Sequence, residues 1–353
     1  MSKEKVTIQD IANALSLSRT TVSKALNGSS GMPEKTVRAV LQKAKEMNYK
    51  QFAYLADAQD TQAGQSEKGG NLALLAHIMP NRFHIASTLM ATLEQEISKH
   101  GYSLTIHILS NEDIHSLSLP QNLKLGQVDA LICLELFDEA YTRMLCGLQK
   151  PVLFSDAYCG FPHHSLHADL LLMENKYSVY HMLHSIIKTT GIHSVGFIGD
   201  PNHCLSFHER FESFKAALMD SGIPYHPQNC IMDDDSFYGD DAWLSKRLTA
   251  LTTLPDMFFC ANDLLAMQTS SCLSKMGVSI PEDVLLCGFD DTFSLSSMNS
   301  TLTTVRTPSA DMGIIASRLL LNRIADPDLP ATFTYLRTEV QFRQSTKLIP
   351  AES

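Results

Sequence analysis

Three side chains with complementary hydrogen-bonding groups, Arg210, Asn262 and Asp290, stand next to apolar runs in the second half of the sequence. Asp290 follows the predicted strand 284–287, and Asn262 follows the predicted strand 257–260 in the same way. Both are candidates for a binding cleft, because ligands of α/β sheets bind outside the carboxyl ends of the strands. Arg210 stands at the start of a helical stretch, where its guanidinium can reach two hydroxyls or one carboxylate. An acceptor, an amide and a bidentate donor together suit a polyhydroxylated ligand.

Each of these three residues also has a purely structural interpretation. Asn262 can cap the helix that follows it, and Arg210 can form a surface ion pair with Glu212 or Asp241. Asp290 can be a turn residue in an Asp-Asp-Thr loop. The sequence leaves these alternatives open.

The elements that would position these residues alternate along the chain from about residue 71. Short apolar runs, which are candidate buried strands, begin near residues 72, 105, 130 and 152 and again near 194, 257 and 284, with helical stretches between them. This alternation is typical of parallel sheets covered by helices. Two series of this kind predict two α/β subdomains with a cleft between them.

The first fifty residues predict a small helical domain that binds DNA. A capping-box pattern at Thr7 to Asp10 introduces one helix, Ser18 can cap a second over 19–26, and Pro33 suits the first turn of a third. Two helices joined by a three-residue turn form a helix-turn-helix, whose second helix enters the major groove. Val22 is expected in the core of this domain.

Charge is distributed unevenly along the chain. Residues 1–50 hold nine Lys/Arg and four Asp/Glu, a net charge of +5, whereas the whole chain carries −10 and the remainder therefore −15. A small basic unit on an acidic body is typical of a protein that binds nucleic-acid phosphates. A helical domain with solvated Lys and Arg side chains is the alternative.

Composition favours a cytoplasmic globular protein. The 353 residues are 44% hydrophobic and 19% charged, which predicts two or three domains with ample core. No run approaches the roughly eighteen apolar residues of a membrane helix, and the amino terminus lacks the apolar region of a signal peptide. No membrane partner is therefore expected. The eight cysteines are scattered without a C-x-x-C pair, which favours reduced thiols.

No metal, cofactor or catalytic residue is predicted. The histidine cluster His163, His164 and His167 has no second cluster at ligand spacing, and the common nucleotide-binding and hydrolase motifs are absent. An enzyme with Asp263 and Asp290 as acid and base would need a nucleophile or a phosphate-binding motif beside them. The sequence offers neither.

Several separated motifs resemble the lactose/galactose-repressor family of transcription regulators. The stretch Thr7 to Gly28 is similar to the headpiece of that family, and Asn48-Tyr49 falls where its third helix ends. The resemblance continues through four motifs of the body: Arg210-Phe-Glu-Ser-Phe214, Ala261-Asn-Asp263, Gly288-Phe-Asp-Asp291 and Leu302-Thr-Thr-Val-Arg-Thr-Pro308. It spans nearly the whole chain in the family's order.

This resemblance implies a fold class and a function. The fold would be an all-α helix-turn-helix headpiece (1–50), a linker (51–70) and a periplasmic-binding-protein-like α/β body of two parallel-sheet subdomains. The N-subdomain would comprise 71–161 and 292–324, and the C-subdomain 162–291 and 325–346. The protein would repress transcription from a palindromic operator in double-stranded DNA, as a homodimer or alternatively a tetramer. A small effector, a sugar or sugar derivative, would control it; a neutral sugar, a sugar phosphate and a purine all remain open.

The resemblance also implies residue roles. Arg210, Asn262 and Asp290 would contact the effector, and Asp291 would support the loop. On the other side of the cleft, Asn81 and Phe83 would face the ligand. In the headpiece, base edges would be read by Arg19, Thr20 and Lys24. Further hydroxyl and amide side chains suit phosphate oxygens, namely Thr7, Ser18, Thr21, Ser23, Asn27 and Thr36.

The sequence departs from the family just after the headpiece. The family continues Asn-Tyr-x-Pro-Asn into a short helix that inserts a leucine into the minor groove. Here Asn48-Tyr49-Lys50 runs into Gln51-Phe-Ala-Tyr-Leu-Ala56, with neither Pro nor Asn. Leu55 is the candidate wedge if a few residues are absent relative to the family. The alternative function is therefore a sugar-binding sensor whose DNA binding is weak or non-specific.

Overall fold

The structure is a computed structural model that describes residues 8–15, 17–26, 36, 39–40, 43, 69–77, 85–163, 166–291 and 301–347. The chain divides into two compact units, residues 1–66 and residues 67–353. Among the residues that the structure describes, no helix is both long and apolar enough to cross a membrane.

The first unit contains the predicted helix-turn-helix. Helix α1 (Ile8–Leu15) and helix α2 (Arg19–Leu26) pack through Ile11, Ala12 and Val22, which are fully buried. The Ser18 hydroxyl accepts a hydrogen bond from the Thr21 backbone N–H at 3.0 Å, so Ser18 caps α2 as predicted. Helical backbone recurs at Thr36, Ala39, Val40 and Lys43, where a third helix was expected.

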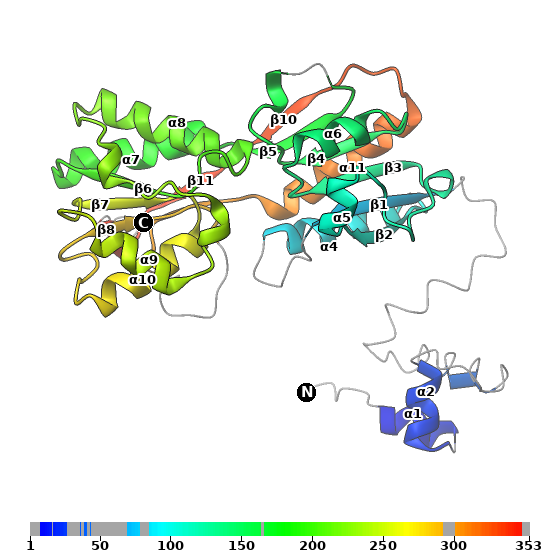
Figure 1. The fold of residues 1–353 in the computed structure, drawn as a ribbon. Coiled ribbons are helices and arrows are strands. Elements are labelled where there is room, and N and C mark those ends of the chain that lie inside the picture. Colours follow the sequence, from blue (N-terminus) through cyan, green and yellow to red (C-terminus); the bar gives the residue numbers. More distant parts are fainter. Residues whose placement is uncertain are drawn as a thin grey trace. The chain divides into compact units, whose positions relative to one another are not determined.

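The second unit begins with a six-stranded parallel sheet in the order β10-β5-β4-β3-β1-β2 (Figure 1). Its strands are β1 (Asn71–Ala76), β2 (Ser103–Ile108), β3 (Ala130–Leu134), β4 (Val152–Ser155), β5 (Asp169–Met173) and β10 (Phe333–Leu336). Alternate residues of β1 enter different cores, with Leu72 and Leu74 on one face and Ala73 and Leu75 on the other. Both faces are buried, which explains why this strand reads as a continuous apolar run.

Helices cover both faces of this sheet. Helices α4 (Ile85–Ser98) and α11 (Ser309–Ala325) pack closely together and contribute to one core, whereas α6 (Glu139–Cys146) contributes to the other. Gly313 permits the close approach of α4 and α11, because a Cβ there would lie 2.6 Å from the Leu89 carbonyl oxygen. We refer to this sheet with its helices as the N-subdomain.

A second sheet forms the C-subdomain. Its parallel strands are β6 (Val195–Ile198), β7 (Met257–Cys260) and β8 (Leu285–Cys287). One face is covered by helices α7 (Lys176–Thr190) and α8 (Leu205–Asp220), and the other by α9 (Asp241–Thr249) and α10 (Asp263–Lys275) (Figure 1). The antiparallel pair β9 (Thr304–Arg306) and β11 (Glu339–Gln341) extends it through bridges from Cys287 to Thr303 and from Asp290 to Arg306.

The chain passes between the subdomains later than the sequence suggested. Strands β5 and β10 pair with each other in the N-subdomain sheet, and β9 belongs with the C-subdomain. The crossings therefore follow Met173, Arg306 and Leu336, instead of lying near Phe161, Asp291 and Ile324. The expected ranges 71–161, 162–291, 292–324 and 325–346 are corrected accordingly, because β5 and β10 belong to the N-subdomain and β9 to the C-subdomain. None of these three short strands was predicted from the sequence. Strand β5 continues the N-subdomain sheet beside β4, and β10 pairs with β5 from far along the chain, whereas β9 pairs with β11.

Candidate functional site

A cavity of about 850 Å³ lies between the two subdomains. Its volume is within the range of small-molecule binding pockets. The cavity is lined by the predicted residues Arg210, Asn262 and Asp290, and so the structure brings these three together. Further lining residues come from both subdomains, among them His77, Asn111, Glu135, Phe137, Asp138, Asp156, Asp200, His203 and Phe207.

Polar residues reach the cavity because they directly follow strands. Glu135 follows β3 and Asp156 follows β4 in the N-subdomain, while Asp200, Asn262 and Asp290 stand just after β6, β7 and β8. The carboxyl ends of parallel strands meet at one edge of a sheet, so the two sheets direct these side chains into the same space. Sequence reasoning used this signal for Asn262 and Asp290 but missed Glu135, Asp156 and Asp200, which carry the same signal.

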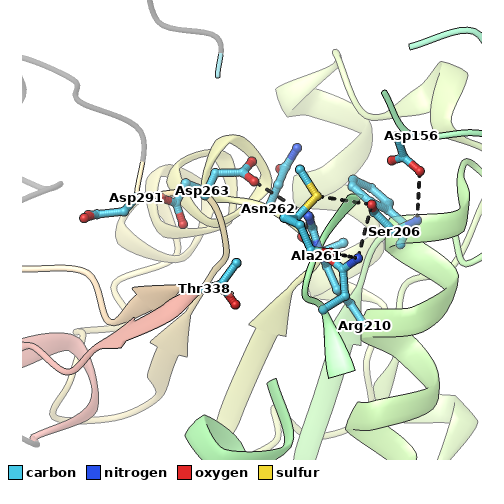
Figure 2. A network of polar contacts seen from close by, with 12 residues as sticks. Asp156, Ser206, Arg210, Ala261, Asn262, Asp263, Asp291 and Thr338 are labelled. Atoms are coloured by element: carbon cyan, nitrogen blue, oxygen red, sulfur yellow. Dashed lines mark hydrogen bonds and ion pairs between the residues drawn. The ribbon is translucent and has the colours of Figure 1, made fainter. Parts of the chain in front are cut away.

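Arg210 is 2% exposed and held from several directions. Its Nε donates to Asn175 Oδ1 at 2.9 Å, and one terminal nitrogen donates to the Ala261 carbonyl at 2.7 Å (Figure 2). The guanidinium carbon lies 3.6 Å from the centre of the Phe289 ring. The other terminal nitrogen is 3.7 Å from Asp290 Oδ1. The alternative of a surface ion pair with Glu212 or Asp241 is therefore wrong, since the guanidinium is buried and oriented at the cavity wall.

Asn262 combines the two roles that the sequence left open. Its side-chain oxygen caps helix α10 by accepting a hydrogen bond from the Leu265 N–H at 2.9 Å, and the residue also lines the cavity. The neighbouring Asp263 is different: it is 2% exposed and accepts a hydrogen bond from the Thr304 hydroxyl at 2.6 Å. Asp263 therefore joins α10 to β9 and is absent from the cavity lining.

The two successive aspartates after β8 have separate surroundings. Asp291 accepts hydrogen bonds from Arg306 at 2.8 Å and from Arg343 at 2.7 Å, so it joins the segment after β8 to β9 and to the segment after β11. Asp290 lies at the cavity beside Arg210 with a backbone φ of 117°. That angle is rarely adopted by residues with a side chain, and it indicates that the surrounding structure holds the carboxylate in place.

Two more cavity carboxylates share an unusual backbone. Glu135 has a φ of 51° and Asp156 a φ of 64°, both in the left-handed region that non-glycine residues seldom occupy. Asp156 also accepts hydrogen bonds from the Ala157 N–H at 2.8 Å and the Ser206 N–H at 3.3 Å (Figure 2). Burial raises the pKa of Asp156, although these bonds and Arg210 act in the opposite direction. Backbone strain of this kind is typically concentrated at functional sites.

An aromatic cluster forms another part of the cavity wall. The ring of His203 lies 4.8 Å from that of Phe137, which comes from the N-subdomain, and 5.0 Å from that of Phe207 on α8. The cluster thus spans both sides of the cavity. Sequence reasoning did not identify it, because no spacing pattern links one residue after β3 to two residues near the start of α8.

A polar network connects the cavity wall to the crossings between subdomains. Asn175, which receives the Arg210 bond, donates to Glu209 at 3.0 Å, and Glu209 accepts from the Tyr335 hydroxyl at 3.0 Å. Tyr335 lies on β10 and Asn175 follows β5, so both belong to segments that cross from the N-subdomain to the C-subdomain. The crossing segments are also joined directly, because the Glu174 N–H donates to the Leu336 carbonyl at 2.7 Å.

The predicted DNA-contacting residues lie in the first unit or outside the described residues. Ser18, Arg19 and Thr20 are exposed at the start of α2, and Thr21 is half-buried. Ser23 and Lys24 belong to the same helix, and Thr36 has helical backbone. The predicted DNA contacts Thr7, Asn27 and Leu55 lie outside the described ranges. The predicted effector contacts Asn81 and Phe83 lie outside them as well. Within the described ranges, no group of three His, Cys, Asp or Glu is placed to hold a metal ion.

Comparison with known proteins identifies both units. Residues 7–51 match the family model of bacterial regulatory proteins of the lacI family, and residues 187–346 match a periplasmic binding protein-like domain. The chain is 24% identical to the HTH-type transcriptional repressor PurR of Mannheimia succiniciproducens, covering 97% of this chain and 99% of that protein.

Two solved structures have the same fold. The complex of transcriptional regulator CelR with cellobiose has a TM-score of 0.68 and 22% identity, covering 97% of this chain and 100% of that one. The lac repressor dimer bound to operator and the anti-inducer ONPF has a TM-score of 0.62 and 19% identity, covering 97% and 99%. The chain therefore combines a helix-turn-helix segment that matches the lacI family of bacterial regulatory proteins with a periplasmic binding protein-like domain.

Proposed function

We propose that this protein is a cytoplasmic homodimeric repressor that binds a palindromic operator and responds to a small polyhydroxylated effector in the cavity. The observation that carries this proposal is Arg210. Its guanidinium stands at the cavity wall and is hydrogen-bonded to Asn175, which lies at a crossing between the subdomains. A ligand that engages Arg210 would therefore act on the part of the fold where one subdomain moves against the other.

The regulatory step would be a shift between cavity geometries. A ligand that touches both Phe137 of the N-subdomain and Arg210 of the C-subdomain binds best at one degree of closure. Only a difference in affinity between two states allows a ligand to bias them. We infer that the favoured closure changes the spacing of two headpieces in the dimer, and hence the affinity for an operator whose half-sites have fixed separation.

In the headpiece, specificity would come from the exposed start of α2. Arg19 is the best candidate for reading guanine, since a guanidinium can donate to both O6 and N7. Thr20 and Lys24 would reach neighbouring base edges, and Ser18 and Thr21 would contact phosphate oxygens. Two-fold symmetry of the dimer implies a palindromic operator.

A second candidate function follows from the segment after the headpiece. Gln51 to Ala56 lacks the proline and asparagine with which the family enters its minor-groove helix. Without that helix, the protein would be a ligand sensor whose DNA binding is weak, salt-sensitive and indifferent to sequence. In either case the cavity would act by binding and not by catalysis, which agrees with the regulators that the chain resembles.

Selection of genomic fragments by the purified full-length protein tests the proposal. Fragments would be recovered at about 50 mM and about 200 mM salt, a range over which non-specific phosphate contacts lose most of their affinity. A shared palindrome that survives at the higher salt is the expected result. Enrichment that disappears with salt and leaves no motif would reject the operator-specific repressor and favour the sensor.

A further inference from the structure

We propose that the effector carries a positive charge, as an amine-bearing polyhydroxylated compound such as an amino sugar does. This inference rests on the proposed function, because it assigns a chemical class to the ligand of the same cavity. The sequence left sugar phosphates and purines open as effectors. A positively charged effector would exclude the sugar phosphates, which are anionic, and any purine that carries no ammonium group.

Negatively charged side chains predominate among the described residues that line the cavity. Its described residues include six carboxylates: Glu135, Asp138, Asp156, Asp200, Asp234 and Asp290. Among the same described lining residues, Arg210 is the one Lys or Arg. The histidines His77 and His203 contribute a positive charge only when protonated. A phosphate entering this space would meet several like charges, whereas an ammonium would reduce the repulsion among them.

Four of these carboxylates, Asp138, Asp156, Asp200 and Asp234, accept hydrogen bonds from backbone N–H groups. Asp138 accepts from the Tyr141 N–H at 2.7 Å, Asp200 from the Asn202 N–H at 2.8 Å and Asp234 from the Ser236 N–H at 3.0 Å. Such bonds fix the orientation of a carboxylate and favour its ionised form, but they leave its net charge in place. Arg210, the one guanidinium among the described lining residues, already donates to Asn175 and Ala261 and lies 3.7 Å from Asp290. The lining therefore keeps an excess of negative charge for a ligand to neutralise.

The carboxylates are distributed around the cavity. Within the described residues, no three His, Cys, Asp or Glu are close enough together to hold a metal ion. The arrangement therefore suits an organic cation, whose hydroxyls and amine can reach several separate acceptors. The aromatic cluster Phe137, His203 and Phe207 supports the same ligand, because aromatic faces attract both sugar rings and ammonium groups. The volume of about 850 Å³ has room for a disaccharide.

Matched sugars provide the test. Glucosamine and the disaccharide of β-1,4-linked glucosamine differ from glucose and cellobiose by an ammonium in place of each 2-hydroxyl. Calorimetric titration of the full-length protein with these four compounds and with glucose 6-phosphate is expected to show binding of an amine at least tenfold tighter than its neutral counterpart. No binding of the phosphate is expected. Raising NaCl from about 50 to about 500 mM should weaken amine binding more than neutral binding.

Substitution of Asp200 by Asn identifies the source of the preference. Asparagine keeps an acceptor for the Asn202 N–H while removing the charge, so Asp200→Asn should reduce the amine-to-neutral ratio severalfold. Asp328→Asn is the matched control, because Asp328 is an exposed aspartate after α11 that does not line the cavity. Equal or tighter binding of the neutral sugars or the phosphate, or no binding of either amine, would overturn the proposal.

Operator binding measured on the same samples separates this inference from the proposed function. A protein that selects a palindrome but prefers a neutral ligand would refute only the charge of the effector. A protein that binds the amine but selects no palindrome would refute the operator-specific repressor and retain the assigned ligand class.

Discussion

At the scale of single residues, the cavity depends on groups that are buried and fixed before a ligand arrives. Arg210 and Asn262 each hold local structure and also line the cavity, so neither is explained by one role alone. The sequence could predict both because each belongs to a recognisable motif beside a strand or helix. The residue types alone did not separate Asp290 from Asp291, whereas the resemblance assigned Asp290 to the effector and Asp291 to the loop; the structure shows Asp291 engaged by Arg306 and Arg343.

Arg210→Lys should abolish the effector response while leaving operator binding intact. Lysine keeps the charge but cannot donate simultaneously to Asn175 and Ala261 in the planar geometry of a guanidinium. Without these bonds the cationic group loses its fixed position at the cavity wall, and loss of one charge-assisted bond to the effector, about 2 kcal/mol, would lower effector affinity more than tenfold. Titration with a ligand that stabilises the wild type measures this; unchanged affinity would remove Arg210 from the binding site.

Asp156→Asn should alter the pH dependence of stability. Burial raises the pKa of Asp156 in the folded protein, so the ionised carboxylate destabilises the fold at neutral pH. As the pH falls through the raised pKa, the native protein takes up a proton before the unfolded chain does, and wild-type stability improves relative to the variant. The groups beside it that favour its ionised form are the charged Arg210 guanidinium and the Cys204 thiol, which stays neutral because burial raises its own pKa.

Thermal unfolding followed between about pH 7.5 and pH 4.5 measures this difference. At about pH 7.5 the Asn variant should unfold at a temperature at least as high as that of the wild type. As the pH falls toward about 4.5, the melting temperature of the wild type should rise relative to that of the variant. A constant difference across that range would contradict the assigned environment of Asp156.

At the scale of elements, the long apolar and amphipathic segments were predictable and the short strands were not. The helices of the headpiece and strands such as β1 have clear periodicity or continuous burial. Strand β10 has four residues, two of them exposed, and its partner β5 lies more than 160 positions earlier in the sequence. Pairing over such a distance leaves no local signal, and for that reason the crossings were placed too early.

Ser18→Ala should destabilise the headpiece through helix α2. The Ser18 hydroxyl accepts the Thr21 N–H, and removing an N-cap side chain costs about 1 kcal/mol. Operator affinity should fall with it, because α2 carries the predicted base-reading residues. Ser18→Asn, which restores a capping oxygen, is the control and should recover most of the loss in circular dichroism melts and in operator binding. If alanine and asparagine behave alike, the cap contributes little.

Tyr335→Phe tests the network between the cavity and the crossings. The change removes only the hydroxyl that donates to Glu209, a loss of about 1 kcal/mol. We expect a severalfold change in the effector concentration needed for half-maximal response, with little change in operator affinity without effector. Gel-shift titrations measure both quantities. Identical response curves for wild type and variant would show that this hydrogen bond does not contribute to the coupling.

At the scale of the whole molecule, the chain combines a basic helix-turn-helix unit with an acidic body that encloses a cavity. The charge difference between residues 1–50 and the remainder was evident from the sequence. The concentration of carboxylates around one cavity was not, because it arises only when strand ends from two sheets face each other. The order of the two units is that of the two matched family models, residues 7–51 and 187–346, and the acidic lining is a property of this chain's own residues.

The most direct test of coupling between the cavity and DNA binding measures operator affinity with and without a compound that occupies the cavity. The compound is one that raises the melting temperature of the wild type but not that of Arg210→Lys. Fluorescence anisotropy with a selected operator should show at least a fivefold change in wild-type affinity, in either direction, and none for the variant. A compound that binds the wild-type cavity through Arg210 and leaves operator affinity unchanged would contradict the coupling between the two units.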